Sequence, residues 1–271
     1  MKNYLFFILI IMVFLLFPEF VMAQKISEPQ IAESEKTNLY LTVPATIQGG
    51  EITDGRDLKR IRWGRHSDFE RIVFDIYEVK YDQQQEYPAE KSCFFDIKYE
   101  YYPPRFVITL HGIRQRSAEY KTFLKSQLIQ DTYLIPYLDD AGIKFAVELN
   151  QPVEYEIFSL SKPGRIVIDI RKIEEPAALD PVFSVRTKKL LILENLAHLK
   201  EDLYNYGGQN IRILKSADGD MFLEESYYDN RAEAEKRLEE INHFIAEISS
   251  NLGEEVLFFI EKRTASLTSE N

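Results

Sequence analysis

The chain has a single cysteine, Cys93, among its 271 residues. One thiol cannot form an intrachain disulfide, so hydrophobic cores have to hold the fold together. Cys93 stands in no motif that marks a nucleophile, and we expect it to be a small buried hydrophobe. Because 45% of the residues are hydrophobic and 13% are aromatic, the chain can fill two domains of roughly 100 to 150 residues each.

Positively charged residues are fewer than negatively charged ones. The chain has 33 lysines and arginines against 44 aspartates and glutamates, which gives a formal net charge of -11. The phosphate backbone of DNA or RNA repels such a chain. Nucleic acid is therefore not expected as a partner.

Catalytic and metal-binding motifs are missing. No serine stands in a Gly-x-Ser-x-Gly elbow, and no glycine-rich phosphate loop is present. The four histidines, at positions 66, 111, 198 and 243, share no metal-ligand spacing with another ligand. The sequence therefore predicts no enzyme, no catalytic residues, no metal and no cofactor.

The one long hydrophobic run lies at the N-terminus, over residues 4–17. Lys2 precedes it, Pro18 ends it, and Val21-Met22-Ala23 offers a cleavage site. This pattern predicts a signal peptide over residues 1–23, export across the inner membrane to the periplasm or cell envelope, and no membrane span after cleavage. The alternative is an uncleaved anchor, although a spanning helix needs roughly 20 apolar residues.

Residues 24–50 are polar and predict a linker, and residues 51–173 then form short β-rich runs between turns. Three of these runs begin with arginine and then alternate, at residues 71–76, 105–110 and 165–170. Alternation of this kind makes one face of a strand apolar. Residues 51–173 are therefore predicted to form an all-β sandwich.

Composition changes to acidic and proline-containing over residues 174–181, which we interpret as a second linker. The following residues, 182–262, have the pattern strand, helix, strand, strand, helix, strand. Asn230 can cap the second helix, with Glu233 as its reciprocal partner. This order predicts an α+β domain of the ferredoxin-like βαββαβ type, followed by a tail over residues 263–271.

Two motifs in the first domain resemble the AMIN family of bacterial envelope domains. The sequence GRHSDFERIVFD at residues 64–75 resembles the opening of these domains, and KPGRIVID at residues 162–169 resembles their closing strand. The resemblance covers residues 58–173. It implies a non-catalytic β-sandwich that targets exported proteins to the cell wall or to envelope assemblies.

Residues 182–262 resemble the SPOR domain. The matching motifs are FSVR at 183–186, MFL at 221–223 and DNRAEAE at 229–235. The chain departs from the family at Arg186, where glutamine is usual, and at Ser226, where glycine is usual. SPOR domains bind septal peptidoglycan that has lost its stem peptides, so the resemblance implies glycan binding during cell division. Strand alternation places the candidate ligand-binding residues on the sheet face opposite the helices, which we expect to be open: Ser184, Arg186, Phe222 and Glu224.

A second candidate binding region joins Trp63, Arg65 and His66 with the aromatic pair Tyr101 and Tyr102. Their rings can stack on sugars, or they can simply cover the edge of the sandwich. His66 and the nearby Asp68 have the residue types needed for acid–base chemistry. We favour the alternative, in which Asp68 caps a turn and His66 packs or hydrogen-bonds to the backbone, because catalysis also needs a nucleophile or a metal and a cleft.

The sequence thus predicts an exported, non-catalytic envelope protein that binds peptidoglycan or wall-associated components. One alternative is a scaffold that binds protein partners in a secretion or division complex. A further one is a glycan-modifying hydrolase that uses His66 and Asp68. The sequence does not predict the oligomeric state.

Overall fold

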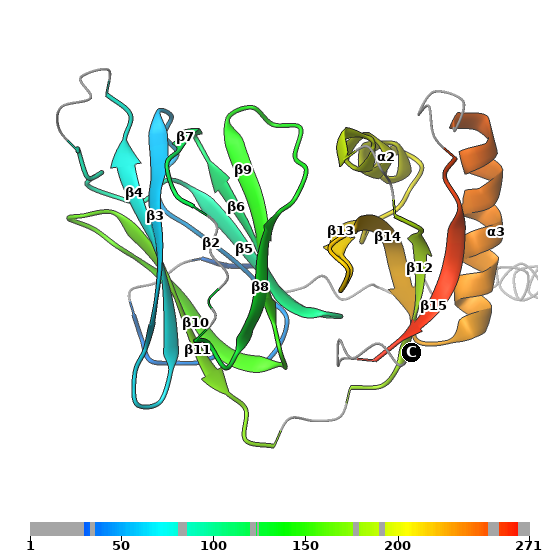
Figure 1. The fold of residues 1–271 in the computed structure, drawn as a ribbon, viewed down its shortest axis with the longest axis horizontal. Helices are drawn as coiled ribbons and strands as arrows, with labels where there is room; N and C mark the ends of the chain where they lie inside the picture. Colours follow the sequence, from blue (N-terminus) through cyan, green and yellow to red (C-terminus); the bar gives the residue numbers. More distant parts are fainter. Residues whose placement is uncertain are drawn as a thin grey trace, which may run out of the picture.

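The structure is a computed structural model that describes residues 30–32, 36–80, 86–119, 123, 125–175, 179–189, 193–248 and 255–264. The expected signal peptide and most of the expected C-terminal tail lie outside these residues. The described chain is mostly β, with three sheets and two helices. Figure 1 shows two sheets on one side and the third sheet with both helices on the other.

The first eleven strands form two sheets that enclose one hydrophobic core, and we call this part the two-sheet unit. Neighbouring strands are antiparallel except for the pairs β1–β2 and β3–β7. The six-stranded sheet has the order β1 (Gln30–Ala32), β2 (Thr46–Gly49), β5 (Phe95–Tyr101), β6 (Pro104–His111), β9 (Gly142–Leu149) and β8 (Ile129–Leu134). The five-stranded sheet has the order β10 (Val153–Leu160), β11 (Arg165–Lys172), β4 (Glu70–Glu78), β3 (Arg56–Arg65) and β7 (Ile113–Arg116).

The alternation seen in the sequence accounts for the core of this unit. Ile72, Phe74 and Ile76 on β4 are fully buried, and so are the matching apolar residues on β6 and β11. The all-β prediction for residues 51–173 is confirmed at this level. The expected linker differs in part, because β1 and β2 within it join the six-stranded sheet.

The remaining elements form the α+β unit, in the predicted order of strands and helices. Its sheet is antiparallel with the order β13-β14-β12-β15. Helix α2 packs against β13 and β14, and α3 packs against β12, β14 and β15 (Figure 1). As predicted, Asn230 caps α3, because its Oδ1 accepts a hydrogen bond from the backbone N–H of Glu233 at 3.0 Å. The elements are β12 (Val182–Thr187), α2 (Leu193–Asn205), β13 (Arg212–Lys215), β14 (Met221–Tyr228), α3 (Arg231–Ile248) and β15 (Phe258–Arg263).

The two units pack against each other through the outer face of the six-stranded sheet. Val107, Tyr133 and Ala146 on that face belong to the same hydrophobic cluster as Ile213 of β13 and Leu199 of α2. In Figure 1, β13 is the strand of the α+β unit nearest to this sheet. The edge strand of one unit is therefore covered by the other, which removes an exposed edge that another chain could pair with.

Candidate functional site

The four residues expected to bind glycan share one sheet face, but that face is not open. Ser184 and Glu224 are 0% exposed and Phe222 is 1% exposed. Arg186 lies over the Phe222 ring, with its guanidinium carbon 3.6 Å from the ring centroid. The expectation of an open face is therefore wrong for these side chains, and their binding of glycan stays a prediction.

The burial of Glu224 has a clear physical cause. Its carboxylate accepts hydrogen bonds from the Ser184 hydroxyl at 2.5 Å, from Arg263 at 3.2 Å, and from Arg212 at 2.8 Å through Nε. A carboxylate can be removed from water only when it is paired and hydrogen-bonded in this way. Glu224 thus ties all four strands of the sheet together, because its partners come from β12, β13 and β15.

The second candidate region does not come together as one site. Trp63 and Arg65 lie on β3, where the Trp63 ring N–H donates to Glu70 at 2.8 Å and Arg65 donates to the Lys125 carbonyl at 2.6 Å. His66 is exposed and stacks on Phe69, with 4.3 Å between the ring centroids.

The two tyrosines of that region lie at the β5–β6 turn, on the other sheet. The Tyr101 hydroxyl donates to the Thr42 carbonyl, and the Tyr102 hydroxyl donates to the Asp180 carbonyl at 2.9 Å. The Tyr102 ring also contacts Tyr227 of β14, with 5.2 Å between the centroids. Tyr102 therefore helps to join the two units.

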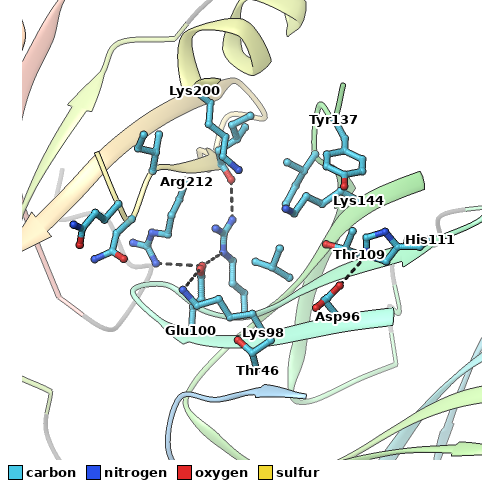
Figure 2. Close-up of a pocket in the computed structure, with 17 residues that line it drawn as sticks. Thr46, Asp96, Lys98, Glu100, Thr109, His111, Tyr137, Lys144, Lys200 and Arg212 are labelled. Carbon is cyan, nitrogen blue, oxygen red and sulfur yellow. Dashed lines mark hydrogen bonds and ion pairs between the residues drawn. The ribbon is translucent and has the colours of Figure 1, made fainter. Parts of the chain in front are cut away.

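The structure contains a cleft between the two units that the sequence did not predict. It has a volume of about 350 Å³ and is lined by residues of β2, β5, β6 and β9 on one side and of α2, β13 and the loop before β13 on the other (Figure 2). Five of its lining residues are lysine or arginine and only two are aspartate or glutamate, although the chain as a whole is acidic. The cleft is therefore a concentration of positive charge on a negative protein.

A buried ionic network forms the floor of the cleft. The Glu100 carboxylate lies 2.8 Å from Arg105 Nε, 3.2 Å from Arg212 Nη1 and 3.5 Å from Lys98 Nζ. Arg105 also donates to the Tyr133 hydroxyl at 3.0 Å and to the Ile213 carbonyl at 2.9 Å. Because Ile213 and Arg212 lie on β13, this network fastens the α+β unit to the two-sheet unit.

The electrostatics of Glu100 follow from these contacts. Burial by itself raises the pKa of the Glu100 carboxyl group. The charges of Arg105, Arg212 and Lys98 outweigh this effect and hold the pKa well below its usual range. Glu100 is therefore an ionised partner for the cations around it rather than a proton donor.

Two further lysines, Lys144 of β9 and Lys200 of α2, point into the cleft (Figure 2). Both are half-buried. Burial lowers the pKa of Lys144 to about 8, with a further contribution from the charge of Lys200. Burial likewise lowers the pKa of Lys200. In the part of the chain that the structure describes, neither ammonium group forms an ion pair.

Paired polar groups occupy the far end of the cleft. His111 Nε2 lies 2.7 Å from Asp96 Oδ2, and Asp96 also accepts a hydrogen bond from Gln48. Thr109, on the same strand as His111, adds a hydroxyl group to the lining. Both carboxylates of the cleft thus already have partners.

The described residues contain no group of three histidine, cysteine, aspartate or glutamate side chains placed to hold a metal ion. Among the helices that the structure describes, none is long and apolar enough to cross a membrane. Comparison with known proteins found no matching family model, no matching curated protein and no matching solved structure.

Proposed function

We propose that this chain is an exported, non-catalytic binding protein of the bacterial cell envelope, which recognises peptidoglycan or a wall-associated component in the cleft between its two units. The observation that carries the proposal is the cleft itself, a polar and cationic cavity to which both units contribute side chains. Ligand pockets typically have volumes of about 300 to 1,000 Å³, and the junction of two units is one of the places where they form preferentially.

The fold supports the resemblances on which the envelope assignment rests. The two-sheet unit carries the two AMIN-like motifs on β3, β4 and β11, where their alternating residues Ile72, Phe74, Ile166 and Ile168 face the core. The α+β unit has a split βαβ order with the β13–β14 hairpin between its two helices, as a SPOR-like, ferredoxin-like domain requires.

The cleft is a better candidate site than the sheet face of the α+β unit. Ser184, Phe222 and Glu224 are buried, and a glycan strand would have to displace a fully paired carboxylate to reach them. The cleft exposes lysine, threonine and amide groups instead. Such groups suit a wall polymer, which presents hydroxyl, amide and carboxylate groups.

The test is co-sedimentation of residues 24–271 with purified peptidoglycan sacculi, before and after amidase treatment. Amidase removes the stem peptides and leaves a free carboxylate on each muramic acid residue. We expect the protein to sediment with sacculi, and to do so more strongly after the treatment, because a cationic cleft gains a matching carboxylate. If the protein stays in the supernatant with both preparations, the proposal is wrong.

One surface feature favours the scaffold alternative as a second candidate. Leu134, Tyr137 and Leu138 are 41%, 37% and 48% exposed and lie close together in sequence at the end of β8. Exposed apolar groups mark protein contacts where they form a contiguous patch. The scaffold is favoured if the protein does not sediment with sacculi but recovers one specific envelope protein in a pull-down from membrane extract. Leu138→Asp should then reduce the amount of that partner recovered.

A further inference from the structure

We infer that Lys144 and Lys200 together form a binding site for an oxyanion, a carboxylate or a phosphate group carried by an envelope polymer. The site lies within the cleft described above. Its natural ligand rests on the proposed function, but the existence of the site does not. Nothing in the sequence motifs points to these two lysines.

The geometry places the two side chains so that one ligand can meet both. Lys144 is on β9 of the two-sheet unit and Lys200 is on α2 of the α+β unit, and Figure 2 shows both directed into the same cavity. The Lys144 ammonium group lies 5.2 Å from the centroid of the Tyr137 ring, which forms part of the wall. An anion between the lysines would bridge the two units.

The charges of the two lysines are only partly offset by the protein, because Glu100 attracts both and Asp96 attracts Lys144 without forming an ion pair with either. Neither has an ion-pair partner among the described residues, and each is partly withdrawn from water. Two like charges in a half-buried cavity are unfavourable unless an anion joins them. The lowered pKa of Lys144 reflects this, since burial is the largest cause and the charge of Lys200 is the next.

The nearby carboxylates do not act as ion-pair partners for Lys144 and Lys200. Glu100 is engaged by Arg105, Arg212 and Lys98, and Asp96 is engaged by His111. These pairs neutralise the carboxylates that would otherwise repel an incoming anion. The cleft therefore keeps a positive excess where the lysines point.

The chemistry of the lining defines the ligand class. An ammonium group forms charge-assisted hydrogen bonds with carboxylate and phosphate oxygens. Thr109 and Asn210 add neutral polar groups to the same cavity. A small oxyanion attached to a polar body, such as a sugar acid or a polyol phosphate, fits this combination.

The experiment is calorimetric titration of the purified chain with N-acetylmuramic acid, which carries a carboxylate, and with glycerol 3-phosphate. We expect at least one probe to bind, and the tighter of the two identifies the source of the anion. Lys144→Gln and Lys200→Gln should each weaken that binding by about tenfold to a hundredfold, because each removes a hydrogen bond to a charged group. Lys91→Gln removes an exposed lysine outside the cleft and should leave binding unchanged.

Two readouts separate this role from a structural one. Without ligand, the two cleft variants should melt no lower than the wild-type protein, because the lysines they remove have no ion-pair partner. Binding of N-acetylmuramic acid should also weaken as the pH rises from 7 to 9, since Lys144 loses its charge near its pKa of about 8. The titratable groups that face Lys144 come from five parts of the fold: Lys200 from α2, Glu100, Asp96 and Lys98 from β5, Arg105 and His111 from β6, Arg212 from β13, and Tyr137 from the loop between β8 and β9.

Several results would overturn the inference. These are no binding of either probe, equal binding by the wild-type protein and both cleft variants, or cleft variants that melt well below wild type without ligand. The proposed function fails separately. If the probes bind at the lysines but the protein does not sediment with sacculi, the oxyanion site is supported and the proposed wall binding is contradicted. If the protein sediments with sacculi but neither probe binds, wall binding is supported and the oxyanion site is contradicted.

Discussion

Replacing Arg105 by leucine is expected to lower the free energy of unfolding by about 3 to 5 kcal/mol, the usual cost of removing one partner from a buried ion pair. Arg105 is 1% exposed and contacts Glu100, Tyr133 and the Ile213 carbonyl. Its loss leaves the carboxylate with less compensating charge and removes a hydrogen bond between the two units. Urea unfolding monitored by Trp63 fluorescence and by circular dichroism gives the value.

Arg114→Leu is the matched control. Arg114 also forms a two-bond pair with a carboxylate, to Asp54 at 2.7 and 3.1 Å, but both side chains are well exposed. Solvent screens such a pair, so the unfolding midpoint should stay close to wild type. Equal losses in the two variants would show that burial of the Arg105 network does not contribute to stability.

Replacing Glu224 by leucine should cost a similar amount, about 3 to 5 kcal/mol, because Arg212 and Arg263 would then lose a buried counter-charge. Ser184→Ala, which removes one neutral donor to the same carboxylate, should cost about 1.5 to 3 kcal/mol. Both values come from urea unfolding of the purified variants.

Glu261→Leu is the control for Glu224. Glu261 is on β15 of the same sheet and pairs with Arg186, but its side chain is 39% exposed. We expect a loss of less than about 1 kcal/mol. If Glu224→Leu were as stable as wild type yet lost binding to sacculi, Glu224 would be a ligand-binding residue, as the SPOR resemblance implies, and the structural role assigned to it would be wrong.

The elements could be predicted because their signals are local. Alternation of apolar residues in the arginine-led runs set the core faces of β4, β6 and β11, and Asn230 marked the start of α3. The same alternation placed Ser184 and Glu224 on the face opposite the helices, where they hydrogen-bond to each other, while Val185 and Leu223 pack with helix residues. Periods of two and of 3.6 residues are sufficient for conclusions of this kind.

The site could not be predicted because it depends on how the two units meet. Alternation assigns Lys144 and Thr109 to the outer face of a sheet, and nothing in a single sequence distinguishes an outer face in water from one covered by another unit. The same limit explains the wrong expectation for the sheet face of the α+β unit. In the sequence, Glu224 looks like a solvated acid, because its partners Arg212 and Arg263 lie on other strands. Outward-facing Val107, Tyr133 and Ala146 in the six-stranded sheet are local signs that this face is covered.

Hydrogen–deuterium exchange with soluble, amidase-treated glycan strands tests the central claim most directly, because it locates the bound ligand on the protein. If the cleft binds wall polymer, saturating glycan should slow exchange in the segments that line it, namely β5, β6, β9 and the chain from α2 to β13. Slowed exchange confined to β12, β14 and β15, or to the end of β3 near His66, would place the ligand elsewhere and contradict the account.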